Sequence, residues 1–484
     1  MPPYTQDVNE LAKKQADMIN DIQSKGPEVA KSIAIANNIV GYNLSPLVTC
    51  LEPMWEQYNL FLKKIPRVPA TGAKAEWWQI DSVTNGMSST YEGGRATENI
   101  TVRNKKEAAY KSIGVYDYVT YEAQAQGKDF MDPEATSIIR ALRKLRQKEE
   151  YKIIGGNITA LTTPAAPSVA VSAGGSITAG AYDIKICPLT AECLQSLILN
   201  KNQGALALVP YLDADNNAIS GRFWGAGVPS AEVQATTTSA NKTITVTITP
   251  TANAFAYAIF AKTGADAYTL QMISTYSVAV LTNYYTTGNA IPSVEGSNDT
   301  LSFDGLLPQI LAAGNAFGKD NAYAQFTADE TGVVQINDAL AGIFDAYRIV
   351  ATNIYVSGDL RNVITKANIQ KGAVYNLVDT PELDKMTVGR VAGKYLHPSL
   401  GAPIDIETHP YLPKGTCMIM TEQVPIPELE GTLMEMHVCQ DYFQRAVPTE
   451  KRRKAFEIFA NEALGMRTPQ YCAVIKNVRP GLAT

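Results

Sequence analysis

The chain has 484 residues, of which 45% are hydrophobic and 18% are charged, and its formal net charge is −5. This length and composition predict several globular units rather than a disordered chain, with surface buried against further copies of the protein. The acidic balance excludes a protein that coats nucleic acid over its whole surface, since phosphate neutralisation requires an excess of Lys and Arg. A local basic surface remains possible.

The N-terminal sequence MPPYTQDVNELAKK lacks the basic start and apolar core of a signal peptide. Apolar runs such as residues 349–356 have the length of a strand and fall short of the roughly 20 residues that span a bilayer. We therefore expect a soluble protein without a membrane partner.

Residues that commonly carry chemistry are scattered along the chain. None of the six cysteines forms a C-x-x-C pair, so we interpret them as reduced core residues: Cys50, Cys187, Cys193, Cys417, Cys439 and Cys472. The three histidines are His397, His409 and His437. The chain has no nucleophile elbow, zinc-protease motif, phosphate-binding loop or dinucleotide motif. We expect no enzyme, no catalytic residue, no cofactor and no metal site.

The first 125 residues contain little that could form a core alone. Residues 1–70 are predicted to be an arm, with short helical stretches followed by prolines that favour extended chain. Residues 71–125 contain β-rich runs on either side of a Gly- and Ser-rich middle, which predicts a long two-stranded loop. Such a ribbon is marginal by itself in water. Both segments are therefore expected to lie against another surface.

A long helix is predicted next. Asp132 is a favourable N-cap, Pro133 suits the first helical position, and Gly155 and Gly156 supply a stop. One apolar stripe is flanked by basic residues that include Arg140, Arg143 and Lys144. We interpret this helix as a structural spine.

The composition changes after the helix. Residues 158–300 are rich in Thr, Ala, Ser, Gly and Val in short alternating runs, which indicates a β-sandwich containing a short helix within residues 189–200. Residues 301–403 combine helical spacing with a buried strand, and residues 404–484 contain four strand candidates. We expect these last strands to pack on the spine helix.

Several segments resemble the tailed-bacteriophage major capsid proteins of the Hong Kong 97 type. They are residues 110–123 (YKSIGVYDYVTYEA), 153–157 (IIGGN), 396–403 (LHPSLGAP), 409–416 (HPYLPKGT) and 470–475 (QYCAVI). The order of these parts over about 300 residues carries the resemblance, which covers residues 71–157 and 301–484.

The resemblance implies an α+β fold of the Hong Kong 97 type with an inserted β-sandwich-like domain. The expected parts are an N-terminal arm (1–70), an E-loop (71–125), a P-domain with spine helix and sheet (126–157 and 404–484), an insertion (158–300) and an A-domain (301–403). The implied function is a major capsid protein that assembles into hexamers and pentamers of an icosahedral shell around phage DNA, in the host cytoplasm and then in the virion. Portal, scaffolding and decoration proteins are the further partners implied.

Two rival functions remain open. One is an encapsulin-like shell with enzyme cargo, which the long insertion disfavours. The other is a β-rich surface adhesin, which the spine helix and the missing signal peptide disfavour.

Two groups of candidate site residues follow. Trp77 and Trp78 would be costly if exposed on a monomer, so we expect them to contact a neighbouring subunit. Basic residues on the spine and near the C-terminus could meet packaged DNA without sequence specificity: Arg140, Arg143, Lys144, Lys451, Arg452 and Arg453. The alternative for the spine is a solvated helix face with pairs such as Arg146 to Glu150. Lys74, Lys105 and Lys106 are either solvated or donors of a Lys–Asn cross-link between subunits.

Overall fold

The computed structural model describes residues 59–83, 92–95, 101–127, 132–200, 205–213, 215–312, 317–329, 331–370, 393–422, 433–449 and 451–483. Most of the expected N-terminal arm, including Cys50, lies outside these residues. The chain divides into two compact units. The described part of the first comprises Asn59, Ile113–Lys148 and Gln440–Ala460, and the second comprises Leu60–Ser112, Glu149–Cys439 and Asn461–Thr484.

The first unit is built from parts of a long helix and of three long strands. The helix is α5 (Pro133–Gly155), and Asp132 caps it by accepting the backbone N–H groups of Glu134 and Ala135 at 3.0 and 3.3 Å. The predicted N-cap and stop of this helix are confirmed. The strands are β4 (Lys111–Thr120), β23 (Met434–Val447) and β24 (Arg453–Met466), and a short helix, α4 (Tyr121–Gly127), follows β4.

Within the first unit, the helix packs on these strands. The Ser137 hydroxyl donates to Asp117 on β4, and Lys454 on β24 pairs with Glu134 at 2.7 Å. The strands β23 and β24 lie in one sheet with β4, in the order β1-β23-β24-β4. The expectation that closing strands pack on the spine helix therefore holds for β23 and β24.

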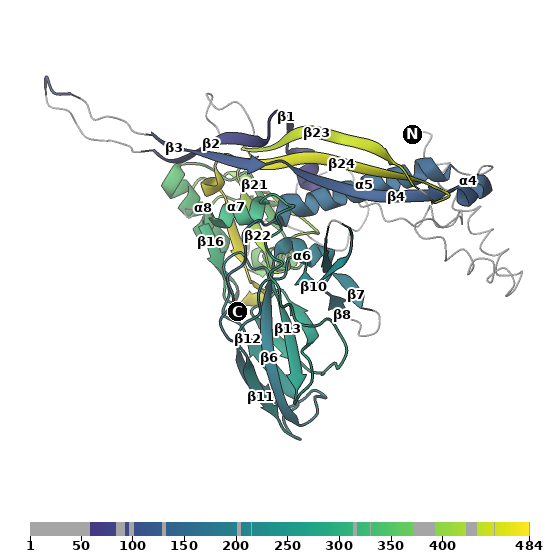
Figure 1. Cartoon of the computed structure of the whole chain (residues 1–484). Coiled ribbons are helices and arrows are strands. Elements are labelled where there is room, and N and C mark those ends of the chain that lie inside the picture. Colours follow the sequence, from purple (N-terminus) through teal and green to yellow (C-terminus); the bar gives the residue numbers. More distant parts are fainter. Residues whose placement is uncertain are drawn as a thin grey trace, which may run out of the picture. The chain divides into compact units, whose positions relative to one another are not determined.

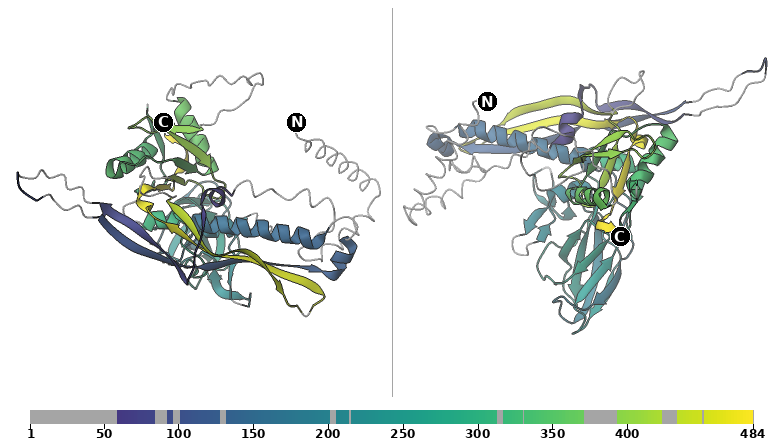
Figure 2. Two further views of the ribbon diagram at one scale, coloured as in Figure 1. Left: turned by 90° about the horizontal axis from the view of Figure 1, so that it is seen from above. Right: turned by 180° about the vertical axis from the view of Figure 1, so that it is seen from behind.

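In the second unit, β2 (Lys74–Val83) and β3 (Thr101–Ala109) form a separate two-stranded antiparallel ribbon (Figures 1 and 2). Their register runs from Lys74 opposite Ala109 to Val83 opposite Thr101. The predicted ribbon is confirmed for residues 74–83 and 101–109, within the expected range of 71–125. Residues 111–120 form β4, which belongs to the sheet with β23 and β24.

A six-stranded sheet lies at the centre of the second unit, in the order β16-β25-β22-β19-β21-β20. Its strands are β16 (Phe317–Asp320), β19 (Asn353–Val356), β20 (Lys394–Leu396), β21 (Pro403–Thr408), β22 (Cys417–Met420) and β25 (Ala473–Lys476). The expected boundary at residue 403 therefore does not separate two sheets. Packing of β21, β22 and β25 on the spine helix stays a prediction. The last strand, β26 (Arg479–Ala483), pairs with β17 (Gln325–Asp329), which also pairs with the short β18 (Gly332–Val333).

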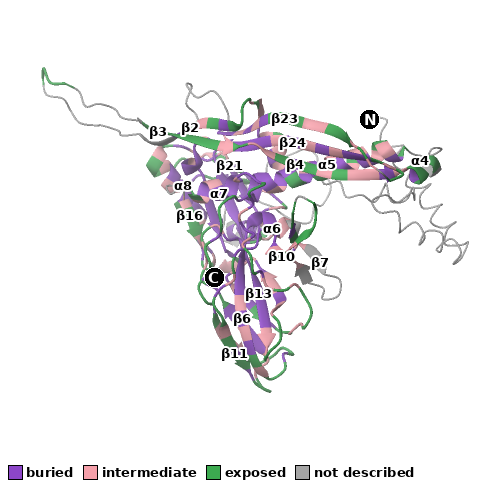
Figure 3. Cartoon of the chain, in the orientation of Figure 1, coloured by how far each residue is buried: buried purple, intermediate pink, exposed green. Residues whose placement is uncertain are grey.

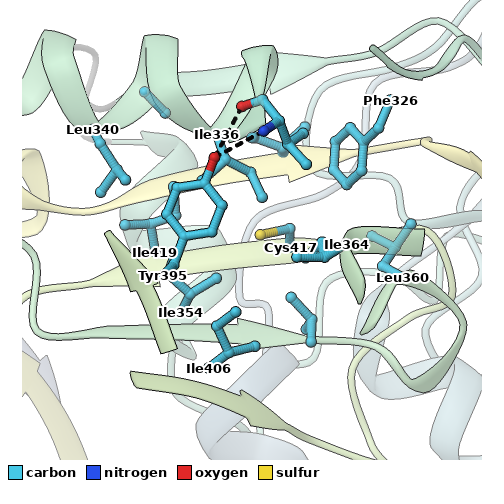
Figure 4. Packing of buried hydrophobic residues seen from close by; sticks show 14 of the residues in the cluster. Phe326, Ile336, Leu340, Ile354, Leu360, Ile364, Tyr395, Ile406, Cys417 and Ile419 are labelled. Atoms are coloured by element: carbon cyan, nitrogen blue, oxygen red, sulfur yellow. Dashed lines mark hydrogen bonds between the residues drawn. The ribbon is translucent and has the colours of Figure 1, made fainter. Parts of the chain in front are cut away.

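One face of the six-stranded sheet packs against α8 (Val334–Tyr347) and α9 (Gly358–Gln370). The strands contribute alternate residues, as the pleat requires, among them Ile354, Ile406 and Ile419 (Figure 4). Tyr395 is buried in this core, where its hydroxyl accepts the backbone N–H of Val333 at 2.9 Å.

The other face of β19 is covered by the short helix α3 (Leu60–Lys64), whose Phe61 ring lies 4.7 Å from that of Tyr355. All four residues of β19 are therefore buried. After α3 comes β1 (Arg67–Pro69), which pairs in parallel with β23. A further short helix, α7 (Leu306–Ala312), is also largely buried.

Residues 168–281 form two packed sheets, in the orders β11-β6-β13-β14 and β15-β12-β5. The strands are β5 (Ser168–Ser172), β6 (Gly180–Leu189), β11 (Val233–Thr237), β12 (Thr243–Thr247), β13 (Ala256–Thr263), β14 (Thr269–Ser274) and β15 (Val278–Leu281). Ile186 and Ile259 from one sheet meet Ile244 and Val246 from the other in a shared core.

The first six residues of β13 are buried (Figure 3), because its second face packs on a further apolar cluster that includes Cys187, Cys193 and Phe223. Around this cluster lie α6 (Ala191–Ser196), β7 (Ile198–Asn200), β8 (Ala205–Ala207), β9 (Pro210–Leu212) and β10 (Ala218–Phe223). The assignment of residues 158–300 as an inserted domain stays a prediction.

Candidate assembly surfaces

The β2–β3 ribbon carries charged side chains along both strands. Lys74 pairs with Glu107 at 2.5 Å and Lys105 with Glu76 at 2.6 Å, and all four side chains are about half exposed. Exposed pairs of this kind contribute at most about 1 kcal/mol each. They favour the interpretation of Lys74 and Lys105 as solvated lysines, and they leave the ribbon weakly held by its own contacts.

The two tryptophans of β2 have different surroundings, because neighbouring residues on a strand point to opposite faces. The Trp77 indole N–H donates to the backbone oxygen of Met466 at 3.0 Å, and its ring stacks on His437 at 5.9 Å. Trp78 is 61% exposed. The expectation of an exposed pair is therefore wrong for Trp77, which packs within its own chain. Contact with a neighbouring subunit stays a prediction for both residues, and the exposure of Trp78 makes it the stronger candidate.

A cavity of about 500 Å³ lies beside the base of the ribbon. Its lining includes Trp77, Lys106, Lys111, Ser302, Asp304 and Leu464. Lys111 donates to the backbone oxygen of Thr300 at 2.6 Å, and burial raises the pKa of Asp304. The Ser302 hydroxyl, also in this lining, donates to the backbone oxygen of Phe303 at 3.3 Å.

A buried charge cluster fixes β1 to the end of α5 and to β24. The Arg67 guanidinium lies between the carboxylates of Glu149 and Glu462, with the contact to Glu462 at 3.0 Å. Both glutamates are essentially inaccessible to solvent. Burial, and then the negative charge of Glu149, raise the pKa of Glu462 well above its usual range. One guanidinium therefore lies between two buried carboxylates.

A second buried cluster fixes α3. The Glu150 carboxylate accepts the backbone N–H groups of Phe61 and Leu62, each at 2.9 Å, and lies 2.8 Å from His409 Nε2. Glu150 is fully buried, so its interpretation as part of a solvated pair with Arg146 is wrong. Lys64, at the end of α3, contacts Glu407 at 2.6 Å. The chain that follows residue 58 is thus attached by charges from distant parts of the sequence.

These clusters were missed from the sequence. The signal available was Glu149 and Glu150, two adjacent acids within a helix otherwise rich in Lys and Arg. Local spacing does not show that the partners are Arg67 and His409.

The six basic residues proposed to face DNA all lie in the first unit, three on α5 and three at or beside the start of β24. Lys144, Lys451 and Arg452 are exposed, and the Arg452 side chain lies 3.6 Å from Glu122. Arg453 stacks over the Tyr118 ring at 4.4 Å. Arg140 and Arg143 are partly buried. DNA contact stays a prediction for all six.

Within the described ranges, no three His, Cys, Asp or Glu side chains gather in a way that could hold a metal ion. Nor does any helix there combine the length and apolarity needed to cross a bilayer. The five described cysteines are free, and four of them are buried. Cys439 is exposed, which corrects its assignment to the core.

No family model and no curated protein match the chain. Solved structures that align with it include the holo-SrpI encapsulin complex from Synechococcus elongatus PCC 7942, with 7% identity, a TM-score of 0.37, and coverage of 89% of this chain and 92% of that one. The cyanophage A-1(L) capsid aligns with 10% identity, a TM-score of 0.38, and coverage of 87% and 93%. The capsid of a native GTA particle aligns with 9% identity, a TM-score of 0.38, and coverage of 88% and 93%.

The Glu149–Arg67–Glu462 cluster predicts a pH dependence of stability. Because the pKa of Glu462 is raised on folding, stability is greatest when this group is protonated and falls as pH rises from about 4.3, the unfolded value, toward the folded pKa. Glu462→Gln lacks this loss. The free energy of unfolding of the variant minus that of the wild type, measured by urea titration, should therefore increase as pH rises above about 4.

Glu76→Gln is the matched control, since it removes one exposed carboxylate from the ribbon. A difference between Glu462→Gln and wild type that stays constant with pH would contradict the assignment.

Proposed function

We propose that this chain is the major capsid protein of a tailed bacteriophage, with the Hong Kong 97 type fold. The observation that carries the proposal is the β2–β3 ribbon, which forms a sheet of its own and exposes Trp78. A two-stranded ribbon is marginally stable in water, and a large exposed aromatic side chain gains most by burial against a partner. In a closed shell, the ribbon of each subunit would rest on its neighbour.

The order of elements supports the same proposal. The ribbon is followed by a long capped helix, then by five strands of the sheet covered by α8 and α9, and then by the long strands β23 and β24, after which β25 completes that sheet. This is the order implied by the sequence resemblance: E-loop, spine helix, A-domain and closing P-domain strands. The two packed sheets of residues 168–281 fall within the proposed insertion, which we assign either to a clamp between subunits or to a decoration domain.

The proposed mechanism is assembly rather than catalysis. Copies of the chain would tile hexamers and pentamers in the host cytoplasm, and modest contacts would be multiplied through the closed shell of the virion. Portal, scaffolding and decoration proteins are proposed as further partners.

Shell formation and shell contents test the proposal together. The protein expressed alone, or with a scaffolding protein, should form closed icosahedral particles in negative-stain micrographs. Particles purified from infected cells should contain nuclease-protected DNA. Small discrete oligomers alone would contradict any shell role, whereas closed particles filled with protein cargo would favour the encapsulin-like alternative.

Trp78 provides a sharper test of the ribbon. Trp78→Ala should greatly reduce the yield of particles while leaving the circular dichroism and thermal unfolding of the subunit unchanged, because the side chain is mostly exposed within its own chain. Leu212→Ala, at another exposed apolar residue (44% exposed), is the matched control. Normal particle yield from the Trp78 variant would remove the ribbon from the interface.

Exposed basic residues provide a test of DNA contact. The double variant Lys451→Gln, Arg452→Gln should assemble normally but hold DNA less tightly, with a smaller dependence of DNA release on salt concentration, since each lost phosphate contact reduces that slope by about 0.9. Lys394→Gln, on the edge strand β20, is the control. An unchanged salt dependence would assign Lys451 and Arg452 to an ordinary solvated surface.

A further inference from the structure

A lysine and two carboxylates from three distant parts of the second unit meet in a buried cluster. Lys152 comes from the last turn of α5, Glu192 from the first turn of α6, and Asp299 from the loop before α7. Lys152 Nζ lies 3.2 Å from Asp299 Oδ2 and 3.4 Å from Glu192 Oε1. Their exposed fractions are 8%, 5% and 2% for Lys152, Glu192 and Asp299, so these charged groups face one another rather than water.

The two oxygens of Asp299 have different partners. Oδ1 accepts the Tyr211 hydroxyl at 3.2 Å and the backbone N–H of Leu301 at 3.0 Å, whereas Oδ2 faces Lys152. Two donors on Oδ1 would stabilise negative charge that develops there if the carboxyl carbon were attacked. Oδ2 would then be the oxygen that departs.

Aromatic rings enclose the cluster. Trp224 stacks on Tyr211 at 4.8 Å, lies 5.5 Å from Lys152 Nζ, and donates a hydrogen bond to Glu192. In such surroundings an amide is favoured over a pair of separated charges, because burying charges is costly and burying a hydrogen-bonded amide is much less so.

Glu192 is placed to carry the proton. Burial raises the pKa of its carboxyl. Burial also lowers the pKa of Lys152, but the charges of Glu192 and Asp299 outweigh this and raise it overall. The amine therefore keeps its proton until an acceptor takes it, and Glu192 Oε1, 3.4 Å from Lys152 Nζ, is the carboxylate beside the amine other than Asp299 itself.

We propose that Lys152 and Asp299 form an intramolecular isopeptide bond, with Glu192 as the proton carrier. Lys152 Nζ, after giving a proton to Glu192, attacks Cγ of Asp299, and the electron pair of the C=O bond moves to Oδ1. The tetrahedral centre then collapses and the C–Oδ2 bond breaks. Oδ2 leaves as water, taking one proton back from Glu192 and a second proton from the nitrogen. One ammonium and one carboxylate become one secondary amide and one water, and no oxidant or cofactor is required.

The bond would join two positions that are 147 residues apart in the sequence. One position precedes the segment of the two packed sheets in the chain and the other follows it. It would fix both ends of this segment to α5, so that force applied to the segment would be carried by a covalent bond. The inference concerns contacts within one chain and does not depend on the proposed function.

Mass spectrometry of the full-length protein tests the inference. The intact wild-type mass should be lower by one water than the mass of its sequence, and Glu192→Gln should show the full mass of its own sequence. A tryptic digest of the wild type should contain a peptide beginning at Glu149 joined through Lys152 to a peptide beginning at Thr263, which contains Asp299, with no cleavage after Lys152.

A second lysine with two acids provides the matched control. Lys262 lies 3.5 Å from Asp183 and 3.8 Å from Glu232, but its cluster is more exposed. Glu232→Gln should leave the mass deficit of the protein intact. A wild-type mass equal to that of the sequence, or Lys152 joined to Glu192 instead, would overturn the assignment. The digest of the wild type decides this even where the Glu192 variant does not fold.

Discussion

The second unit depends on charges buried at the end of α5. Glu149, Glu150 and Lys152 lie within four residues of one another, and each binds a different part of the chain. Glu149 meets Arg67 on β1, Glu150 meets α3 and His409, and Lys152 meets Glu192 and Asp299. A buried charge without a partner costs several kcal/mol. The main effect of these three side chains is therefore to specify which segments of the chain pack together. Their net contribution to the free energy of unfolding is smaller.

The local features of the fold were predictable and the long-range ones were not. The limits of α5 follow from Asp132 and Gly155, and the ribbon follows from β-rich runs around a Gly-rich middle. The burial of Glu150 could not be predicted, because its partners are 89 and 259 residues away. For the same reason, nothing in the short runs of residues 403–408 and 473–476 indicates that both belong to the sheet of β19.

For the candidate interface, the sequence could not show which of two adjacent tryptophans is exposed. The sequence marks Trp77 and Trp78 equally, and strand alternation requires only that they face opposite ways. Which one packs inward is decided by Met466 and His437, from strands that arrive near the end of the chain. The adjacent Lys–Glu pairs are about half exposed on the ribbon, whereas Arg67 on β1 meets two buried carboxylates.

The position of β25 has a consequence for biosynthesis. This strand, residues 473–476, lies between β16 and β22, so without it the six-stranded sheet is divided. Glu462, which closes the cluster around Arg67, likewise follows its partner by 395 residues. Domains generally fold as they leave the ribosome, beginning with the N-terminal part. Here the central sheet cannot be completed until the chain has been synthesised through residue 476, well after β16 and β22 have emerged.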